Sequence, residues 1–167
     1  GVGLHGGTRV AMTLNPAKPD TGIVFRRTDC AGAEIAARFD NVSDTMLGTS
    51  LKNGDGVGVA TVEHLMAALA GLEIDNLVIE LDGAEVPIMD GSAAPFVYLA
   101  ECAGIVEQAM PRTAIEVLKP VEVSDGERFA SLSPSVGFSI SCEIEFCHPA
   151  IARQSCYVDL ANGAFKR

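Results

Sequence analysis

The residues with the clearest capacity for chemistry are an adjacent glutamate and histidine, Glu63 and His64, in the segment TVEHLMAALAG at residues 61–71. A histidine in the first turn of a helix experiences the positive end of the helix dipole, which favours the neutral, metal-binding imidazole. The neighbouring carboxylate stays ionised and can accept a proton from water. The pair therefore suits metal-assisted hydrolysis. The alternative is a capping glutamate beside a hydrogen-bonded surface histidine, since the H-E-x-x-H pairing of zincins is absent.

A helix over residues 61–71 would position this pair. Its core-facing positions recur at helical spacing and comprise Val62, Leu65, Met66 and Leu69. Thr61 is the expected N-cap. Ala67 and Ala68 occupy the other face, where a solvent-facing helix usually carries charge. Alanines there predict that another element or a ligand approaches closely.

The remaining chain alternates short strand patterns with turns. Strands are expected at residues 10–14, 22–26, 49–52, 76–81, 85–89, 113–118, 121–124, 128–132, 137–146 and 157–160. A second helix is expected to start at the capping residue Ser92, to carry Pro95 in its first turn and to end at Gly104. Mixed strands and helices with frequent hairpins predict an α+β fold with a largely antiparallel sheet.

The polar, proline-containing connection at residues 105–112 is the expected domain boundary, with domains at residues 1–110 and 113–167. The clearest strand pattern lies in the second domain, at residues 137–146. Its alternating apolar residues are Phe138, Ile140, Cys142, Ile144 and Phe146. One face of this strand is therefore expected to be buried and the other to be wet.

Composition narrows the classes of function. The chain has 167 residues, a formal net charge of -10 and 48% hydrophobic residues, so it can build a core and has no electrostatic reason to bind nucleic acid or anionic lipid. No apolar run approaches the ~18 residues of a membrane span. The five cysteines form no C-x-x-C motif, so free thiols are expected.

Longer motifs carry a family resemblance. The string TVEHLMAALAGLEIDNLVIELDGAEVPIMDGSAAPFVYL at residues 61–99 resembles the UDP-3-O-acyl-N-acetylglucosamine deacetylase family, the bacterial zinc amidases of lipid A biosynthesis. Further motifs that match the family in order are GVGLHGG (1–7), FRRTD (25–29), DTML (44–47) and FCHPAI (146–151). The resemblance implies two α+β domains, each a sheet packed with helices, with the active site between them. It also implies a cytoplasmic enzyme that removes an N-acetyl group from a UDP-linked, O-acylated glucosamine.

The resemblance also implies roles for single residues. His64 would be a zinc ligand, and Glu63 the general base for a water that zinc activates. The expected substrate-binding residues are His5, Leu47, Arg128, Glu145 and Phe146, the last three at the UDP end.

Four of these five substrate-binding roles have a structural alternative. His5 is equally a turn histidine with a backbone hydrogen bond, and Leu47 is a core residue on the sequence alone. Phe146 is otherwise the last inward residue of its strand, and Arg128 a surface cation.

One family motif is absent. The family takes its other zinc ligands from an H-x-x-x-D motif, but the residues four positions after the three histidines are Arg9, Ala68 and Ala152. We therefore expect an N-terminal fragment whose second domain holds only its opening strands, and which is inactive alone. Its unpaired sheet predicts association. The alternative function is a non-catalytic sugar-nucleotide binding module, or a domain that depends on a partner. The oligomeric state is not predicted.

Overall fold

The computed structural model describes residues 1–160 and 165 of the chain, in two compact units, Gly1–Pro111 and Arg112–Arg167. Helices and sheets occur together, so the α+β fold class is confirmed. Within the described residues, no helix is long and apolar enough to cross a membrane. The cysteines are all free thiols, as expected.

The first unit is built on a four-stranded sheet with the order β1-β7-β2-β3. Its strands are β1 (Met12–Pro16), β7 (Leu77–Leu81), β2 (Ile23–Arg27) and β3 (Ala33–Ala36). Two of its three strand pairings, β1 with β7 and β2 with β3, are antiparallel as predicted, whereas β2 and β7 are parallel. A small antiparallel sheet has the order β4-β5-β6 and consists of β4 (Val42–Asp44), β5 (Ser50–Lys52) and β6 (Gly58–Val59).

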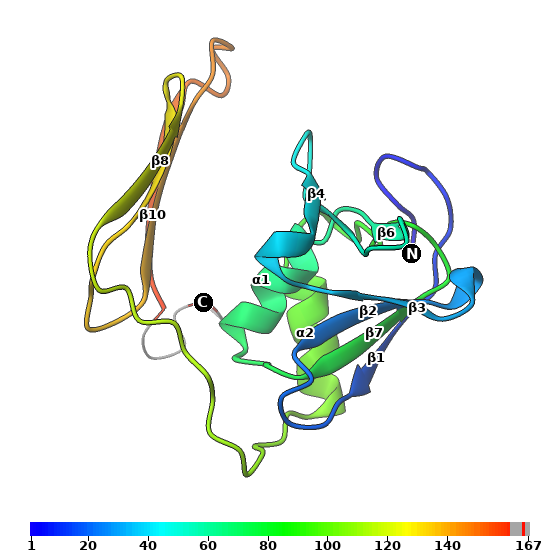
Figure 1. Cartoon of the computed structure of the whole chain (residues 1–167). Helices are drawn as coiled ribbons and strands as arrows, with labels where there is room; N and C mark the ends of the chain where they lie inside the picture. Colours follow the sequence, from blue (N-terminus) through cyan, green and yellow to red (C-terminus); the bar gives the residue numbers. More distant parts are fainter. Residues whose placement is uncertain (161–164, 166–167) are drawn as a thin grey trace. The chain divides into compact units, whose positions relative to one another are not determined.

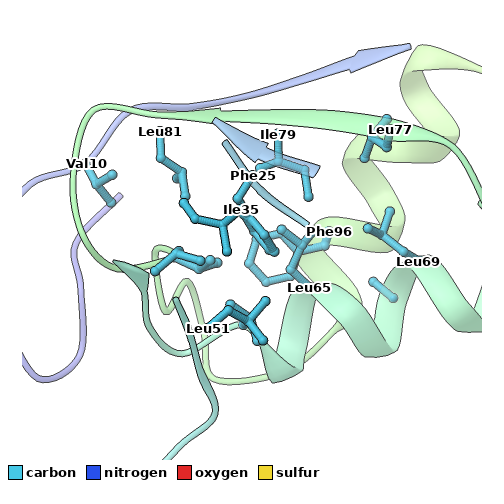
Figure 2. Packing of buried hydrophobic residues seen from close by; sticks show 14 residues of the cluster. Val10, Phe25, Ile35, Leu51, Leu65, Leu69, Leu77, Ile79, Leu81 and Phe96 are labelled. Atoms are coloured by element: carbon cyan, nitrogen blue, oxygen red, sulfur yellow. The ribbon is translucent and has the colours of Figure 1, made fainter. Parts of the chain in front are cut away.

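Two helices, α1 (Glu63–Gly71) and α2 (Ala94–Ala103), pack against each other and cover one face of the four-stranded sheet (Figure 1). The core lies between these layers, and Figure 2 shows sheet residues such as Phe25 and Ile79 facing Leu65 of α1 and Phe96 of α2. All four of these side chains are almost completely buried. This packing fixes α1, and therefore its first turn, against the sheet.

The first turn of α1 differs from the prediction. Thr61 is not the N-cap; that position is Val62, which makes no side-chain cap hydrogen bond. The Thr61 hydroxyl instead donates to Glu85 at 3.0 Å. The expected alanine face is also divided, because Ala68 is buried in the core whereas Ala67 is exposed.

The second helix follows its sequence signals more closely. Pro95 lies in the first turn and Gly104 is the C-cap, with a positive φ of 86° that favours glycine. Ser92 precedes the assigned N-cap, Ala93, but its hydroxyl still accepts the N–H of Ala94 at 3.2 Å.

The second unit consists of two antiparallel hairpins. Its strands are β8 (Val121–Asp125), β9 (Arg128–Leu132), β10 (Ser139–Glu145) and β11 (Arg153–Asp159). The apolar residues of β10 alternate as predicted, but their predicted burial is wrong: Ile140 is 46% and Ile144 is 43% exposed. Among the described residues of this unit, no helix packs on the hairpins to cover that face.

Two other predicted strands are wrong because their residues find no neighbouring strand to form a ladder with. Residues 85–89 make only an isolated bridge, between Ala60 and Glu85, and residues 113–118 form no strand. Pro87 has no N–H to donate to a ladder. Conversely, the short strands β3, β4 and β6 were not predicted, because their length and composition give no clear alternation.

Candidate active site

The candidate active site is the start of α1 and the segments beside it. Glu63 is the first residue of the helix, and its Oε2 accepts the backbone N–H of Thr49 at 2.9 Å. The carboxylate borders an open cavity of 210 Å³. The cavity is lined by Ala37, Arg38, Val42, Thr49, Leu51, Val62, Glu63 and Met66. A carboxylate at the edge of an apolar cavity is well placed to act on a bound molecule.

His5 and the Glu63 carboxylate both lie next to Gly48. A Cβ built on Gly48 would lie 3.2 Å from Glu63 Oε1 and 3.8 Å from His5 Nε2, so both side chains flank the same position. The two residues are 58 positions apart in the sequence, and their meeting depends on the fold. The fold thus brings His5 near Glu63, while the role of His5 in binding substrate stays a prediction.

The ring of His5 also makes the contact that its structural alternative predicted. His5 Nε2 lies 3.2 Å from the carbonyl oxygen of Leu47, to which it donates when Nε2 carries the proton. Leu47 itself is 83% exposed and has a positive φ of 60°, so the alternative that it is a core residue is wrong. An exposed leucine held in the left-handed region next to Glu63 and His5 is a strained surface feature of the kind that gathers at functional sites.

His64 is half-buried, and its Nδ1 atom is buried without a hydrogen-bond partner. A buried nitrogen that lacks a partner costs about 1–3 kcal/mol. The carboxylate of Asp90 lies within the electrostatic influence of this ring. The pKa of Asp90 is lowered, chiefly by hydrogen bonds from the N–H and hydroxyl of Ser92, with a smaller contribution from His64. Since the hydroxyl of Ser92 is engaged with Asp90 and the α2 backbone, it has the role of a turn residue.

A complete metal site is not present in residues 1–160 and 165, where no three His, Cys, Asp or Glu side chains gather closely enough to hold an ion. His64 is therefore the one predicted metal ligand that the described part of the chain offers. It stands next to the predicted base, Glu63, on the same helical turn.

The predicted UDP-binding residues lie in the second unit, on different hairpins. Arg128 opens β9 opposite Asp125, whereas Glu145 ends β10 opposite Arg153. Phe146 follows β10, is 54% exposed, and donates its N–H to Ala152 at 3.0 Å. The side chain of Phe146 thus has an open face, but the hairpin register alone does not bring it to Arg128.

Glu85, which no sequence motif marked as functional, connects the loop carrying His5 to the turn before α1. Glu85 Oε1 accepts the N–H of His5 at 2.9 Å, and Oε2 accepts the N–H of Gly6 at 2.9 Å. No local signal marks this residue, because its partners lie up to 80 positions away.

A glutamate that borders a cavity, with a histidine next to it at the start of a helix, suits chemistry in which a water molecule is activated. The comparison with known proteins specifies the class. The family model for LpxC, UDP-3-O-acyl N-acetylglycosamine deacetylase, matches residues 1–167, and the chain belongs to this family.

Curated relatives carry the same description. A UDP-3-O-acyl-N-acetylglucosamine deacetylase from Myxococcus xanthus is 55% identical over 168 aligned positions, which cover 100% of this chain and 53% of the relative. Proteins of the same name from a Shewanella species and from Pseudoalteromonas atlantica are each 49% identical, over 99% of this chain and 55% of their own length. The chain therefore spans about half the length of the curated relatives it matches.

Proposed function

We propose that the protein hydrolyses the N-acetyl group of UDP-3-O-acyl-N-acetylglucosamine, a step of lipid A biosynthesis in the cytoplasm. Family membership supports the substrate class, because the relatives are named for this deacetylation. The observation that carries the proposal is local: Glu63 and His64 share the first turn of α1, and the Glu63 carboxylate flanks Gly48 together with His5.

Glu63 is the general base in this proposal. Its Oε2 is held by the N–H of Thr49, while Oε1 lies 3.2 Å from the position that a Cβ on Gly48 would take. The carboxylate takes one proton from a water molecule as the water oxygen bonds to the acetamide carbonyl carbon. The carbon–nitrogen bond then breaks, the amine nitrogen takes up a proton, and acetate leaves.

His64 fits a zinc ligand in one respect, since its buried Nδ1 has no partner within the protein. Bound zinc supplies Lewis-acid chemistry: it lowers the pKa of water and polarises a carbonyl group. Catalytic zinc normally has three protein ligands. The described residues provide His64 toward such a set, so we propose that this chain alone neither holds zinc tightly nor turns over substrate.

Five further residues are proposed to bind the substrate. His5 and Leu47 adjoin the base, where they would contact the sugar or the start of its acyl group. Arg128, Glu145 and Phe146 would bind the UDP end, since a guanidinium pairs with phosphate and an exposed aromatic ring can stack on a base.

The test is acetate release from UDP-3-O-acyl-N-acetylglucosamine by the full-length gene product with zinc. Glu63→Gln keeps the size of the side chain but removes the base, and we expect at least a 100-fold loss of kcat. Glu34→Gln is the matched control, because Glu34 is an exposed carboxylate on β3 that pairs with Arg26 at 2.8 Å. Equal activity of both variants would refute the role of Glu63. Substrate binding without acetate release by the wild type would favour the binding-module alternative.

A further inference from the structure

The carboxylate of Glu85 is the most heavily hydrogen-bonded acceptor near the candidate site. It accepts the backbone N–H of His5 and of Gly6, each at 2.9 Å, and the hydroxyl of Thr61 at 3.0 Å. Burial alone would raise the pKa of Glu85. The hydrogen bonds from His5, Gly6 and Thr61 outweigh burial and hold that pKa below its ordinary value. The group is therefore an ionised acceptor at neutral pH.

These hydrogen bonds join two segments that are distant in the sequence. One is the GVGLHGG loop, which carries His5. The other is the turn at Thr61, which precedes Glu63 and His64. The backbone holds Glu85 next to this turn. Ala60 and Glu85 form an isolated β-bridge, and the Val86 N–H donates to the Ala60 carbonyl at 3.0 Å.

The backbone at Thr61 has an uncommon conformation. Its φ is 57°, in the left-handed region that a β-branched residue rarely adopts, and the side chain is buried. Such a conformation persists where the surroundings over-determine it. The hydrogen bond from the Thr61 hydroxyl to Glu85 is a specific interaction that holds the turn in place.

The glycines of the loop are matched to the same carboxylate. A Cβ on Gly3 would collide with the Glu85 side chain, and a Cβ on Gly6 would lie 3.3 Å from Glu85 Oε2. Neither glycine is in the left-handed region, so space, and not backbone freedom, is what these positions require. The loop thus approaches Glu85 closely enough to donate two backbone N–H groups.

We propose that Glu85 is a positioning residue: its carboxylate ties the His5 loop to the Thr61 turn and so sets where His5 lies relative to Glu63. The catalytic consequence rests on the function proposed above for Glu63, whereas the geometric consequence does not. Loss of the tie lets the loop and the helix start move independently, and the pair that flanks Gly48 separates.

The first test is a ¹H–¹⁵N spectrum of the full chain with the substitution Glu85→Gln. The Thr49 amide reports on the Glu63 carboxylate, which it contacts at 2.9 Å, and the His5 ring reports on the loop. We expect both signals to shift. Asp82→Asn is the control, because Asp82 Oδ1 also accepts a backbone N–H, from Ala11 at 2.7 Å, in the same unit. Thr49 and His5 signals that stay in place in Glu85→Gln, as in the control, would overturn the proposal.

A second pair of variants decides the matter if Glu85→Gln does not fold. Thr61→Ser keeps the hydroxyl, whereas Thr61→Val keeps the β-branched shape and loses the donor. We expect the Thr49 and His5 signals of Thr61→Ser to match the wild type and those of Thr61→Val to shift. Equal signals in the two variants would overturn the proposal.

Kinetics of the full-length gene product then test the catalytic consequence. We expect Glu85→Gln to lower kcat about 10-fold with KM within about 2-fold, because a small displacement of the base affects the transition state more than binding. An unchanged kcat despite shifted signals would refute this consequence. A wild-type protein without deacetylase activity would refute the proposed function and leave the spectroscopic result to decide the positioning role.

Discussion

Substitution of Gly48 by alanine is expected to impair the base while leaving the fold intact. The new Cβ would lie 3.2 Å from Glu63 Oε1, closer than the ~3.5 Å of a relaxed contact, so the carboxylate has to retreat by about 0.3 Å. It is not free to do so without cost, because its other oxygen accepts the Thr49 N–H at 2.9 Å. The contact with His5 Nε2, at 3.8 Å, is an ordinary one and needs no adjustment.

The effect on stability should be small because two contributions oppose each other. Weakening the hydrogen bond to the Glu63 carboxylate costs about 1–2 kcal/mol. Gly48 is not in the left-handed region, so alanine fits its backbone and stabilises by about 0.4–1 kcal/mol through the unfolded state. The free energy of unfolding is therefore expected to fall by no more than about 1.6 kcal/mol.

The effect on catalysis should be larger. If a 1 Å misplacement can cost about 100-fold, a retreat of a few tenths of an ångström should lower kcat several-fold, up to about 10-fold. The assay is acetate release by the full-length gene product, combined with thermal unfolding of the same samples. Gly54→Ala is the matched control, because a Cβ there meets nothing within 4 Å and the backbone is likewise not left-handed. Equal kcat values for the two variants would refute the reasoning about Glu63.

Asp29→Asn should destabilise the chain by about 1–3 kcal/mol, because it removes the carboxylate that lies 2.7 Å from the buried guanidinium of Arg27. This loss should exceed that of Arg27→Met, and urea unfolding of the two variants checks which is less stable. The pKa of Asp29 is lowered in the folded state, chiefly by its hydrogen bond with Arg27. The contribution of Asp29 to stability is therefore present above the pKa of its unfolded state and is lost as the pH falls through the pKa of its folded state. Urea unfolding at a series of acidic pH values should show a weaker dependence of stability on pH for Asp29→Asn than for the wild type. Calorimetric titration of the chain with Zn²⁺ should give a Kd above about 10 µM that weakens further in His64→Ala, and nanomolar binding would contradict the single-ligand reasoning. The chain should sediment partly as oligomers through the exposed β10 face, and Ile140→Ser with Ile144→Ser should reduce this association; a monomeric wild type would count against it.

Local patterns predicted the parts of the fold that depend on neighbouring residues. The helix over residues 61–71 was found from its apolar periodicity, and β9 begins and ends where the sequence predicted. The adjacency of Glu63 and His64 is itself local, so the chemistry proposed for this pair could be predicted before the structure. The family resemblance supplied the roles of these residues, which the adjacency alone left open.

Features that depend on distant partners were predicted less well. Thr61 has the composition of an N-cap, but its hydroxyl is used by Glu85, which lies 24 positions away. Leu47 is apolar and was therefore a reasonable core residue, yet the structure exposes it in a strained turn. For β10, alternation predicted which residues share a face but not whether anything covers that face. A pattern in one segment contains no information about the segment that must pack on it.

Two carboxylates of the first unit show why glycines belong to this site as much as acids do. Glu63 accepts the N–H of Thr49 next to Gly48, and Glu85 accepts the N–H of Gly6 and of His5 in a glycine-rich loop. In both places a Cβ on the glycine would press against a carboxylate oxygen. A carboxylate can come this close to the backbone only where the neighbouring residue has no Cβ, which is why glycine is needed there. Gly3, Gly6 and Gly48 are therefore expected to resist substitution through the acids that they contact, although their own φ values would admit alanine.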